Sequence, residues 1–392
     1  MLTPLLTHEI GSLAKPGWRV KAAAGRPCDE ADIQAAESWG KRLDVPDYPR
    51  LVELLRRPAR TGVPLTAAER VEVRNWSSRY GLRFFSSAGL DVIYDGEQQR
   101  SEMYAWAAAH ATGFEFRGSV RSFDNKYYSK AAVTGPVGLR APFHNDEYRL
   151  LHQAADKPVK VPVTGPYTLA AWSFDERPGA AVDLGEPLAR RRARSREARR
   201  ELVLDVAVNL VRPNLEALLG LGARLIQIDE PAGSTVPDEI GLMAEAFDAC
   251  VHGLDATFTT HLCFSDYDLF FPAIGEMTGC RQYTVGFAND DSTELGVGDD
   301  ARPGYRIIKR FRDLPGAPHL GLGVLDIHRD FIEPPELVRD RILHAADVFG
   351  GPERLQVVPD CGLRTRTWEV AHQKLVNMVA GVELARNALG GG

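Results

Sequence analysis

The chain has 392 residues, of which 44% are hydrophobic and 26% charged, and its formal net charge is −6. This length can bury a large core, and the acidic balance gives no reason to expect nucleic acid or an anionic membrane as a partner. No apolar run approaches the roughly 18 residues of a membrane span, and the first residues lack the features of a secretion signal. Five cysteines are too few for a disulfide scaffold in so long a chain. We therefore expect a cytoplasmic protein with free thiols.

Short apolar, β-branched runs recur along the chain, and each ends in polar residues. Eight of them can be identified, at residues 5–10, 92–94, 159–163, 225–228, 257–260, 282–285, 320–325 and 355–358. Helix-length amphipathic segments, such as 188–219, 237–251, 334–348 and 367–389, lie between most of them. Strands that alternate with helices favour a parallel sheet, and eight such units predict an α/β fold of the (β/α)8 TIM barrel type.

Two long excursions interrupt this pattern. The first, at about residues 17–88, follows the first expected strand, and it combines Pro- and Gly-rich turns with a helical pattern. The second, at about residues 113–142, follows the second strand, and residues 114–133 alternate as a hairpin does. We interpret both as insertions into a single barrel domain that spans residues 1–392.

The ends of the expected strands carry side chains capable of chemistry. They are Ser12, Asp95 with Glu97, Thr164, Asp229 with Glu230, His261 with Cys263, Asp326 with His328, and Asp360 with Cys361, whereas Gly286 follows the sixth strand. In a barrel these ends meet at one mouth, where the active site lies. Loops are polar in any case, so the two strand ends that contain cysteine are stronger evidence for an active site than the ends that carry carboxylates.

His261, Cys263 and Cys361 form a candidate metal site. In an extended segment residues two apart face the same side, and barrel closure would bring Cys361 to the same mouth. Two thiolates and one imidazole favour zinc over magnesium or calcium, and three protein ligands leave a position open, as in catalytic zinc sites. A thiol bound there would be deprotonated to a nucleophilic thiolate at neutral pH. From the residues alone the alternative stays open, since a lone cysteine is most often a small buried hydrophobic residue. We assign that role to Cys28, Cys250 and Cys280.

At these residues the chain resembles the catalytic domain of the cobalamin-independent methionine synthase family. The resemblance covers most of the chain in seven ordered segments. They are Glu9-Ile10-Gly11-Ser12-Leu13, Tyr94-Asp95-Gly96-Glu97, Val163-Thr164-Gly165-Pro166-Tyr167-Thr168, Ile226-Gln227-Ile228-Asp229-Glu230-Pro231-Ala232, Thr260-His261-Leu262-Cys263-Phe264-Ser265-Asp266, Gly321-Leu322-Gly323-Val324-Leu325-Asp326-Ile327-His328 and Pro359-Asp360-Cys361-Gly362-Leu363.

The resemblance implies a role for each candidate residue. His261, Cys263 and Cys361 match the family's zinc ligands, and Ser12, Glu97 and Asp229 match residues that hold the amino-acid part of homocysteine. Asp326 and His328 match a pair linked to proton delivery, and Trp172 matches an aromatic residue near the methyl-donor face. The implied activity is methylation of homocysteine, activated as a zinc thiolate, to methionine.

The sequence departs from the family in two respects. Full-length synthases carry a second, N-terminal barrel that helps bind folate, so a methyl-folate and a methyl-corrinoid protein both stay open as donors. Gly286 stands where the family usually has a glutamate as fourth zinc ligand. A zinc-dependent thiol alkyltransferase of the epoxyalkane:coenzyme M transferase type and a non-catalytic barrel are the alternative functions.

Overall fold

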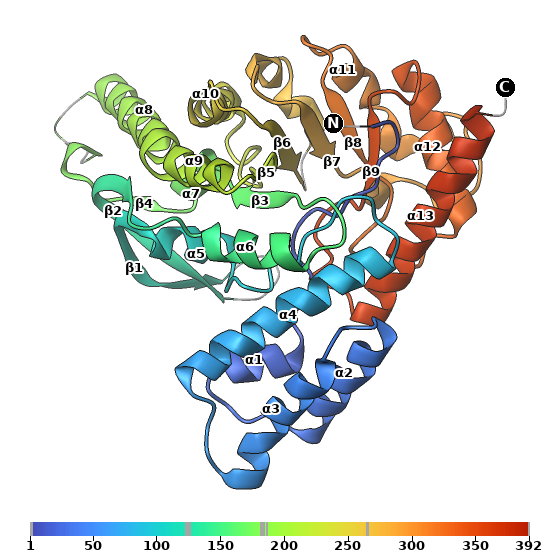
Figure 1. Cartoon of the computed structure of the whole chain (residues 1–392). Helices are drawn as coiled ribbons and strands as arrows, with labels where there is room; N and C mark the ends of the chain where they lie inside the picture. Colours follow the sequence, from blue (N-terminus) through green and yellow to red (C-terminus); the bar gives the residue numbers. More distant parts are fainter. Residues whose placement is uncertain (1–2, 122–126, 181–184, 186, 264–265, 391–392) are drawn as a thin grey trace.

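A six-stranded parallel sheet forms the centre of the molecule (Figure 1). The computed structural model describes residues 3–121, 127–180, 185, 187–263 and 266–390. The strands lie side by side in the order in which they follow one another in the chain: β3 (Val161–Thr164), β5 (Leu225–Asp229), β6 (Thr257–Leu262), β7 (Gln282–Val285), β8 (His319–Gly323) and β9 (Leu355–Val358). All residues of β3, β7 and β9 are buried, as expected for a parallel sheet covered on both faces.

Helices connect the successive strands, because parallel strands need crossover connections. They are α7 (Pro166–Ala171), α8 (Leu188–Asp205), α9 (Arg212–Gly220), α10 (Ile240–Val251), α11 (Ile308–Arg312) and α12 (Pro335–Phe349), and α13 (Trp368–Gly390) follows the last strand. Proline lies at the first helical position of α12, and the helix ends at Gly350, whose φ of 84° is a left-handed conformation that suits glycine.

Two extended segments lie between the first and last strands of the sheet. Thr7 forms a parallel bridge with Val357, His8 forms one with Val92, and Ile93 forms one with Val159. These segments correspond to the first two expected strands, but they form isolated bridges rather than ladders. Among the described residues the fold is therefore a mixed α/β fold on a parallel sheet, and its hydrogen-bonded ladders do not close into a ring.

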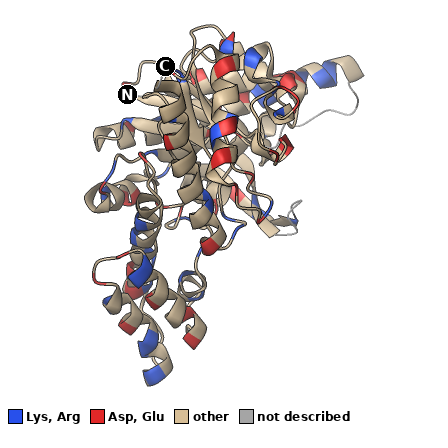
Figure 2. Cartoon of the chain, turned by 90° about the vertical axis from the view of Figure 1, so that its right-hand side faces the viewer, with Lys and Arg blue, Asp and Glu red and all other residues tan. Residues whose placement is uncertain are grey.

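Four helices occupy the first excursion and lie below the sheet in Figure 1. They are α1 (Gly17–Ala23), α2 (Glu30–Arg42), α3 (Tyr48–Thr61) and α4 (Ala67–Ser87). Capping boxes at Asp29 and Thr66 start α2 and α4. An aromatic cluster joins this layer to α13, because the Trp368 ring lies 5.2 Å from Trp39 and 5.0 Å from Phe84. Acidic and basic residues are interspersed over these helices (Figure 2).

The other excursion supplies two strands of a second, three-stranded sheet, whose third strand comes from the segment after α7. β1 (Ala111–Arg121) and β2 (Tyr127–Leu139) pair antiparallel, and the short β4 (Phe174–Asp175) pairs parallel with β2. α5 (Met103–Ala109) precedes this sheet, and α6 (Asn145–Ala154) leads from it back to β3. Residues 122–126 of the expected hairpin lie outside the described residues.

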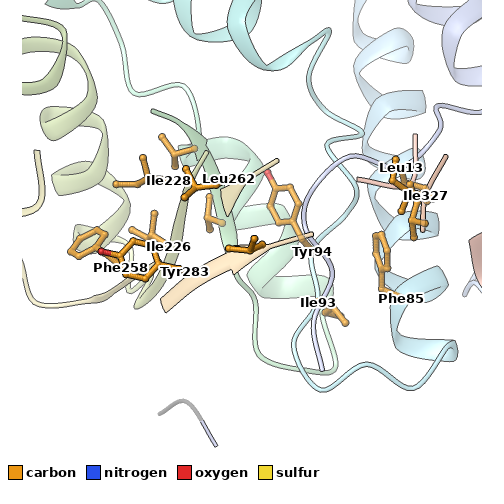
Figure 3. Close-up of a cluster of buried hydrophobic side chains, with 14 of the residues drawn as sticks. Leu13, Phe85, Ile93, Tyr94, Ile226, Ile228, Phe258, Leu262, Tyr283 and Ile327 are labelled. Atoms are coloured by element: carbon orange, nitrogen blue, oxygen red, sulfur yellow. The ribbon is translucent and has the colours of Figure 1, made fainter. Parts of the chain in front are cut away.

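The hydrophobic core spans the sheet and the segments beside it. Figure 3 shows Ile226, Ile228, Phe258, Leu262 and Tyr283 from the strands, together with Leu13, Phe85, Ile93, Tyr94 and Ile327. Within the described part of the chain, no helix combines the length and apolarity that crossing a membrane requires.

Candidate metal centre and substrate site

Three potential metal ligands converge where β6 and β9 end. His261 is in β6, Cys263 follows directly after that strand, and Cys361 lies three residues beyond β9. One ligand atom from each residue lies within 4.8 Å of the other two. Residues almost a hundred positions apart in the sequence are thus brought together at the carboxyl ends of two strands of one sheet.

The hydrogen bonding of His261 suits metal binding. Its Nδ1 lies 3.2 Å from the carbonyl oxygen of Thr284, and a carbonyl can only accept, so Nδ1 carries the proton. The buried Nε2 atom has no hydrogen-bond partner among the described residues. A backbone carbonyl commonly fixes the tautomer of a metal-binding histidine in this way. The orphaned nitrogen beside two sulfur atoms therefore fits a thiophilic ion such as zinc.

The two thiols of the cluster differ in acidity. Hydrogen bonding from Cys263 and the nearby His261 imidazole lower the pKa of Cys361 well below its usual value. The same hydrogen bond and burial raise the pKa of Cys263. One sulfur atom is therefore disposed to be a thiolate even before an ion is considered, and a cation would favour the thiolate form of both.

Gly286 is accounted for by close packing against the loop that carries Cys361. A Cβ atom on Gly286 would lie 3.0 Å from both the Cβ and the carbonyl oxygen of Asp360. The Asp360 carboxylate accepts hydrogen bonds from the backbone N–H groups of Phe287, Ala288 and Asn289, at 3.1, 3.0 and 2.7 Å. Asp360 thus holds the loop after β7 against the loop after β9, and the position offers little room for a side chain.

Asp229 and Ser12 both lie next to residues of the metal cluster. Asp229 ends β5 and is paired in register with His261 on β6. Ser12 packs so closely on Gly362 that a Cβ atom there would collide with its hydroxyl oxygen. Burial raises the pKa of Asp229 to about 7, so a cationic ligand would stabilise its ionised form.

Glu97 is the third residue expected to contact the amino-acid substrate. It is 7% exposed and has a φ of 60°, an uncommon left-handed conformation that is often found at functional sites. Its carboxylate lies 3.7 Å from Arg100, and a Cβ atom on Gly11 would lie 3.3 Å from Glu97 Oε1. Glu97 therefore borders the same N-terminal loop that carries Ser12.

Asp326 and His328 follow β8, and their backbone contacts are well defined. The Asp326 carboxylate accepts a hydrogen bond of 2.8 Å from the backbone N–H of His328. Arg329 lies 3.4 Å from the same carboxylate, and the His328 side chain is exposed. Trp172 caps α7 and packs edge-on against Tyr104 at 6.2 Å. The roles expected for Asp326, His328 and Trp172 stay predictions.

The remaining cysteines lie outside the metal cluster and are buried. Their thiols donate to backbone carbonyls: Cys28 to Trp18, Cys250 to Phe247 and Cys280 to Gln282. They therefore have the structural role that the sequence suggests for most cysteines.

Sequence reasoning missed a buried polar group beneath Asp229. Lys160, Gln227 and Glu9 are each no more than 2% exposed, and Gln227 donates a 2.7 Å hydrogen bond to Asp229. The available signal was a lysine and a glutamine inside runs that are otherwise apolar. Buried charged residues are rare unless they are paired, so a lysine in such a run predicts a buried partner.

A cavity of about 360 Å³ lies beside these loops. Leu13 and Ala14, which follow Ser12, line one side, and Arg364, which follows Cys361, lines another. Tyr127 and Tyr128 from the start of β2 complete its aromatic part. The cavity thus combines aromatic surface with charged side chains of both signs, since Glu102 also lines it.

Comparisons with known proteins identify relatives over nearly the whole chain. The family described as "Cobalamin-independent synthase, Catalytic domain" matches residues 56–384. A methionine synthase of Thermoplasma acidophilum is 35% identical in an alignment that covers 98% of each chain. A methionine synthase of Thermoplasma volcanium is 37% identical over 76% of this chain and 85% of its own.

Two solved structures share the fold of this chain. A B12-independent methionine synthase from Shewanella, solved in complex with selenomethionine, superposes with a TM-score of 0.72 at 20% identity, covering 99% of both chains. A Listeria monocytogenes protein described as a putative vitamin-B12-independent methionine synthase superposes with a TM-score of 0.63 at 16% identity, covering 98% of both chains. The sequence matches show that this chain belongs to the cobalamin-independent methionine synthase family and is an enzyme of the methyltransferase class.

Proposed function

We propose that this enzyme is a zinc-dependent S-methyltransferase that converts homocysteine to methionine, with His261, Cys263 and Cys361 as the metal ligands. The single observation that carries the proposal is the convergence of one imidazole and two thiols within 4.8 Å in a member of this family. Zinc bound there would lower the pKa of a coordinated thiol and so supply a nucleophile at neutral pH.

The protein's own residues would bind and orient the amino-acid part of homocysteine. Asp229 and Glu97 are buried carboxylates suited to an α-ammonium group, and hydrogen bonds to charged groups are the stronger ones. Ser12, with its hydroxyl beside the cluster, is suited to the α-carboxylate. A thiol without an ammonium group would leave the two carboxylates without a cationic ligand, which favours homocysteine over coenzyme M.

We assign proton transfer to the segment that follows β8. His328 would protonate the leaving group of the methyl donor, since imidazole is a common general acid and this side chain is exposed to an approaching donor. Asp326 would orient the segment by accepting the His328 backbone N–H. Trp172 would face the donor. A methyl-folate and a methyl-corrinoid protein are both compatible with this arrangement, and the cavity of about 360 Å³ is where we expect the transferred group to approach.

We further infer that residues 1–392 form one catalytic domain of the (β/α)8 type. The inference is supported by the three bridges that connect the segments around Thr7 and Ile93 with β9 and with Val159, just before β3. In this interpretation the two helical and hairpin excursions are insertions. The five cysteines of this domain form no disulfide among the described residues, which agrees with a cytoplasmic location.

The proposed function is tested by methionine formation from homocysteine with methyl-folates, methylcobalamin and a methyl-corrinoid protein as donors, in parallel with zinc analysis. Asp229→Asn should raise the KM for homocysteine about 10- to 100-fold, the equivalent of one strong hydrogen bond to a charged group, and leave zinc content unchanged. Asp255→Asn, at an exposed position before β6, is the matched control. Unchanged affinity in Asp229→Asn would mean that the thiol substrate has no ammonium group.

A further inference from the structure

Lys160 is a buried cation below the substrate site. It is 1% exposed, and its ammonium group lies 2.7 Å from Gln227 Oε1 and 3.2 Å from the carbonyl oxygen of Ile10. It also donates to the carbonyl oxygen of Glu9. Its ammonium group also lies 3.2 Å from His8 Nδ1, so Lys160 connects the N-terminal segment to β5.

The Gln227 amide has one orientation in this arrangement. An ammonium group only donates hydrogen bonds, so the amide oxygen must face Lys160 and the amide NH2 must face the other way. That NH2 donates to Asp229 Oδ1 at 2.7 Å and to the carbonyl oxygen of Ile10 at 2.7 Å. Lys160 on one side and the two acceptors on the other thus hold Gln227 in the same orientation, with its NH2 group toward the Asp229 carboxylate.

The same contacts join the two parts of the amino-acid site. Ile10 lies two residues before Ser12, which we assign to the substrate carboxylate, and Asp229 is assigned to the ammonium. Lys160 itself lines a separate cavity of about 650 Å³, together with residues at the starts of strands such as Leu225, Thr257 and Gln282. Lys160 thus lies on the side of the site remote from the strand ends, where it supports substrate-binding groups from below.

We propose that Lys160 is a positioning residue that, through Gln227, fixes Asp229 and the Ser12 segment at the spacing of an α-amino acid. The enzyme thereby selects thiols that carry an ammonium and a carboxylate on the same carbon over simple thiols. This inference rests on the proposed function, because it uses the substrate roles of Ser12 and Asp229.

Glu9 allows the positioning role to be separated from simple charge balance. Its carboxylate lies 3.6 Å from Lys160, and neither of its oxygen atoms has a hydrogen-bond partner within the described residues. Lys160→Met alone would leave this buried carboxylate without a cation and destabilise the fold. The double variant Glu9→Gln/Lys160→Met removes both charges, so its stability should lie closer to that of the wild type.

The experiment compares the zinc-loaded wild type, Lys160→Met, Glu9→Gln/Lys160→Met and Gln227→Leu. Steady-state rates are measured with homocysteine and with 2-mercaptoethanol, a thiol without the amino-acid group, and calorimetry measures L-methionine binding. We expect the double variant and Gln227→Leu to raise the KM for homocysteine and weaken methionine binding about tenfold, with kcat and the use of 2-mercaptoethanol changed less than about twofold. Lys157→Met, in the same segment but bonded to Leu90, should keep the wild-type KM.

The outcomes separate this inference from the function on which it rests. A wild type that neither methylates homocysteine nor binds L-methionine would overturn the proposed function. A wild type that does both, with a double variant of unchanged homocysteine KM, would reduce Lys160 to a charge partner of Glu9. Equal losses with homocysteine and 2-mercaptoethanol would also overturn the positioning role, because they would indicate general damage to the site.

Discussion

Replacing Asp360 by asparagine tests how the loop next to the metal cluster is held. The aspartate is 3% exposed, and its Oδ1 accepts two backbone N–H groups while Oδ2 accepts the third, from Asn289, at 2.7 Å. Asparagine can keep one oxygen in place for two of these donors, but its NH2 group would then face the third. The change removes one charge-assisted hydrogen bond and strands a donor, so we expect a loss of about 2–4 kcal/mol in the free energy of unfolding.

Urea unfolding of the zinc-loaded and chelator-treated protein measures this loss. The zinc affinity should also fall, about 10- to 100-fold, as is typical when a group that supports metal ligands is removed. Asp313→Asn, an exposed aspartate paired with Arg312, should change stability by less than about 0.5 kcal/mol. An equally small change in Asp360→Asn would show that the carboxylate does not hold the two loops together.

Four further predictions concern the metal, the glycine, pH and proton transfer. Cys361→Ser and His261→Ala should lose most of the bound zinc in elemental analysis, and Cys280→Ser should retain it; full zinc in either ligand variant would refute the assignment. Gly286→Ala should destabilise the protein by about 1–3 kcal/mol, because its Cβ would lie 3.0 Å from Asp360, and wild-type stability would mean that the loop yields freely. Burial lowers the pKa of His144 well below 6.5. Below about pH 6.5 only the unfolded state takes up this proton, so the free energy of unfolding should fall by up to about 1.4 kcal/mol per pH unit. Unfolding measured at a series of pH values should show a smaller slope in His144→Asn. His328→Gln should lower turnover without loss of zinc, and an unchanged rate would remove His328 from the mechanism.

The strands were predictable because burial on both faces leaves a plain sequence signal. Apolar runs at 282–285 and 355–358 coincide with β7 and β9. The runs at 5–10 and 92–94 were expected to be strands of the same sheet, but they form only isolated bridges. Leu5 has a φ of 55°, so the first segment starts outside the β region of backbone conformation. The spacing of apolar residues in the sequence does not reveal such a conformation.

The metal cluster was predictable for a different reason. A histidine and a cysteine two residues apart at a strand end are uncommon, and parallel strands bring their carboxyl ends to one edge. The residues that hold the site in place were not predictable from the sequence. In the sequence, the glycine at position 286 suggested only that a zinc ligand is missing. The structure shows that this position packs closely against Asp360. Lys160 and Glu9 are separated by 151 residues, and nothing in local patterning shows that they pair.

The contacts of the N-terminal segment with β9 and α13 have a consequence for how a newly made chain matures. Leu5 and His8 donate backbone hydrogen bonds to Leu355 and Val357, and Trp368 donates to the carbonyl oxygen of Ala14. Residues 5–14 are synthesised well before these partners in β9 and α13, and contacts so distant in sequence form slowly. A ribosome stalled before β9 would hold a chain in which Leu5 and His8 lack their partners in β9 and in which Cys361 is missing from the metal cluster. Such incomplete chains should depend on chaperones and be inactive, because surface exposed in this way promotes aggregation.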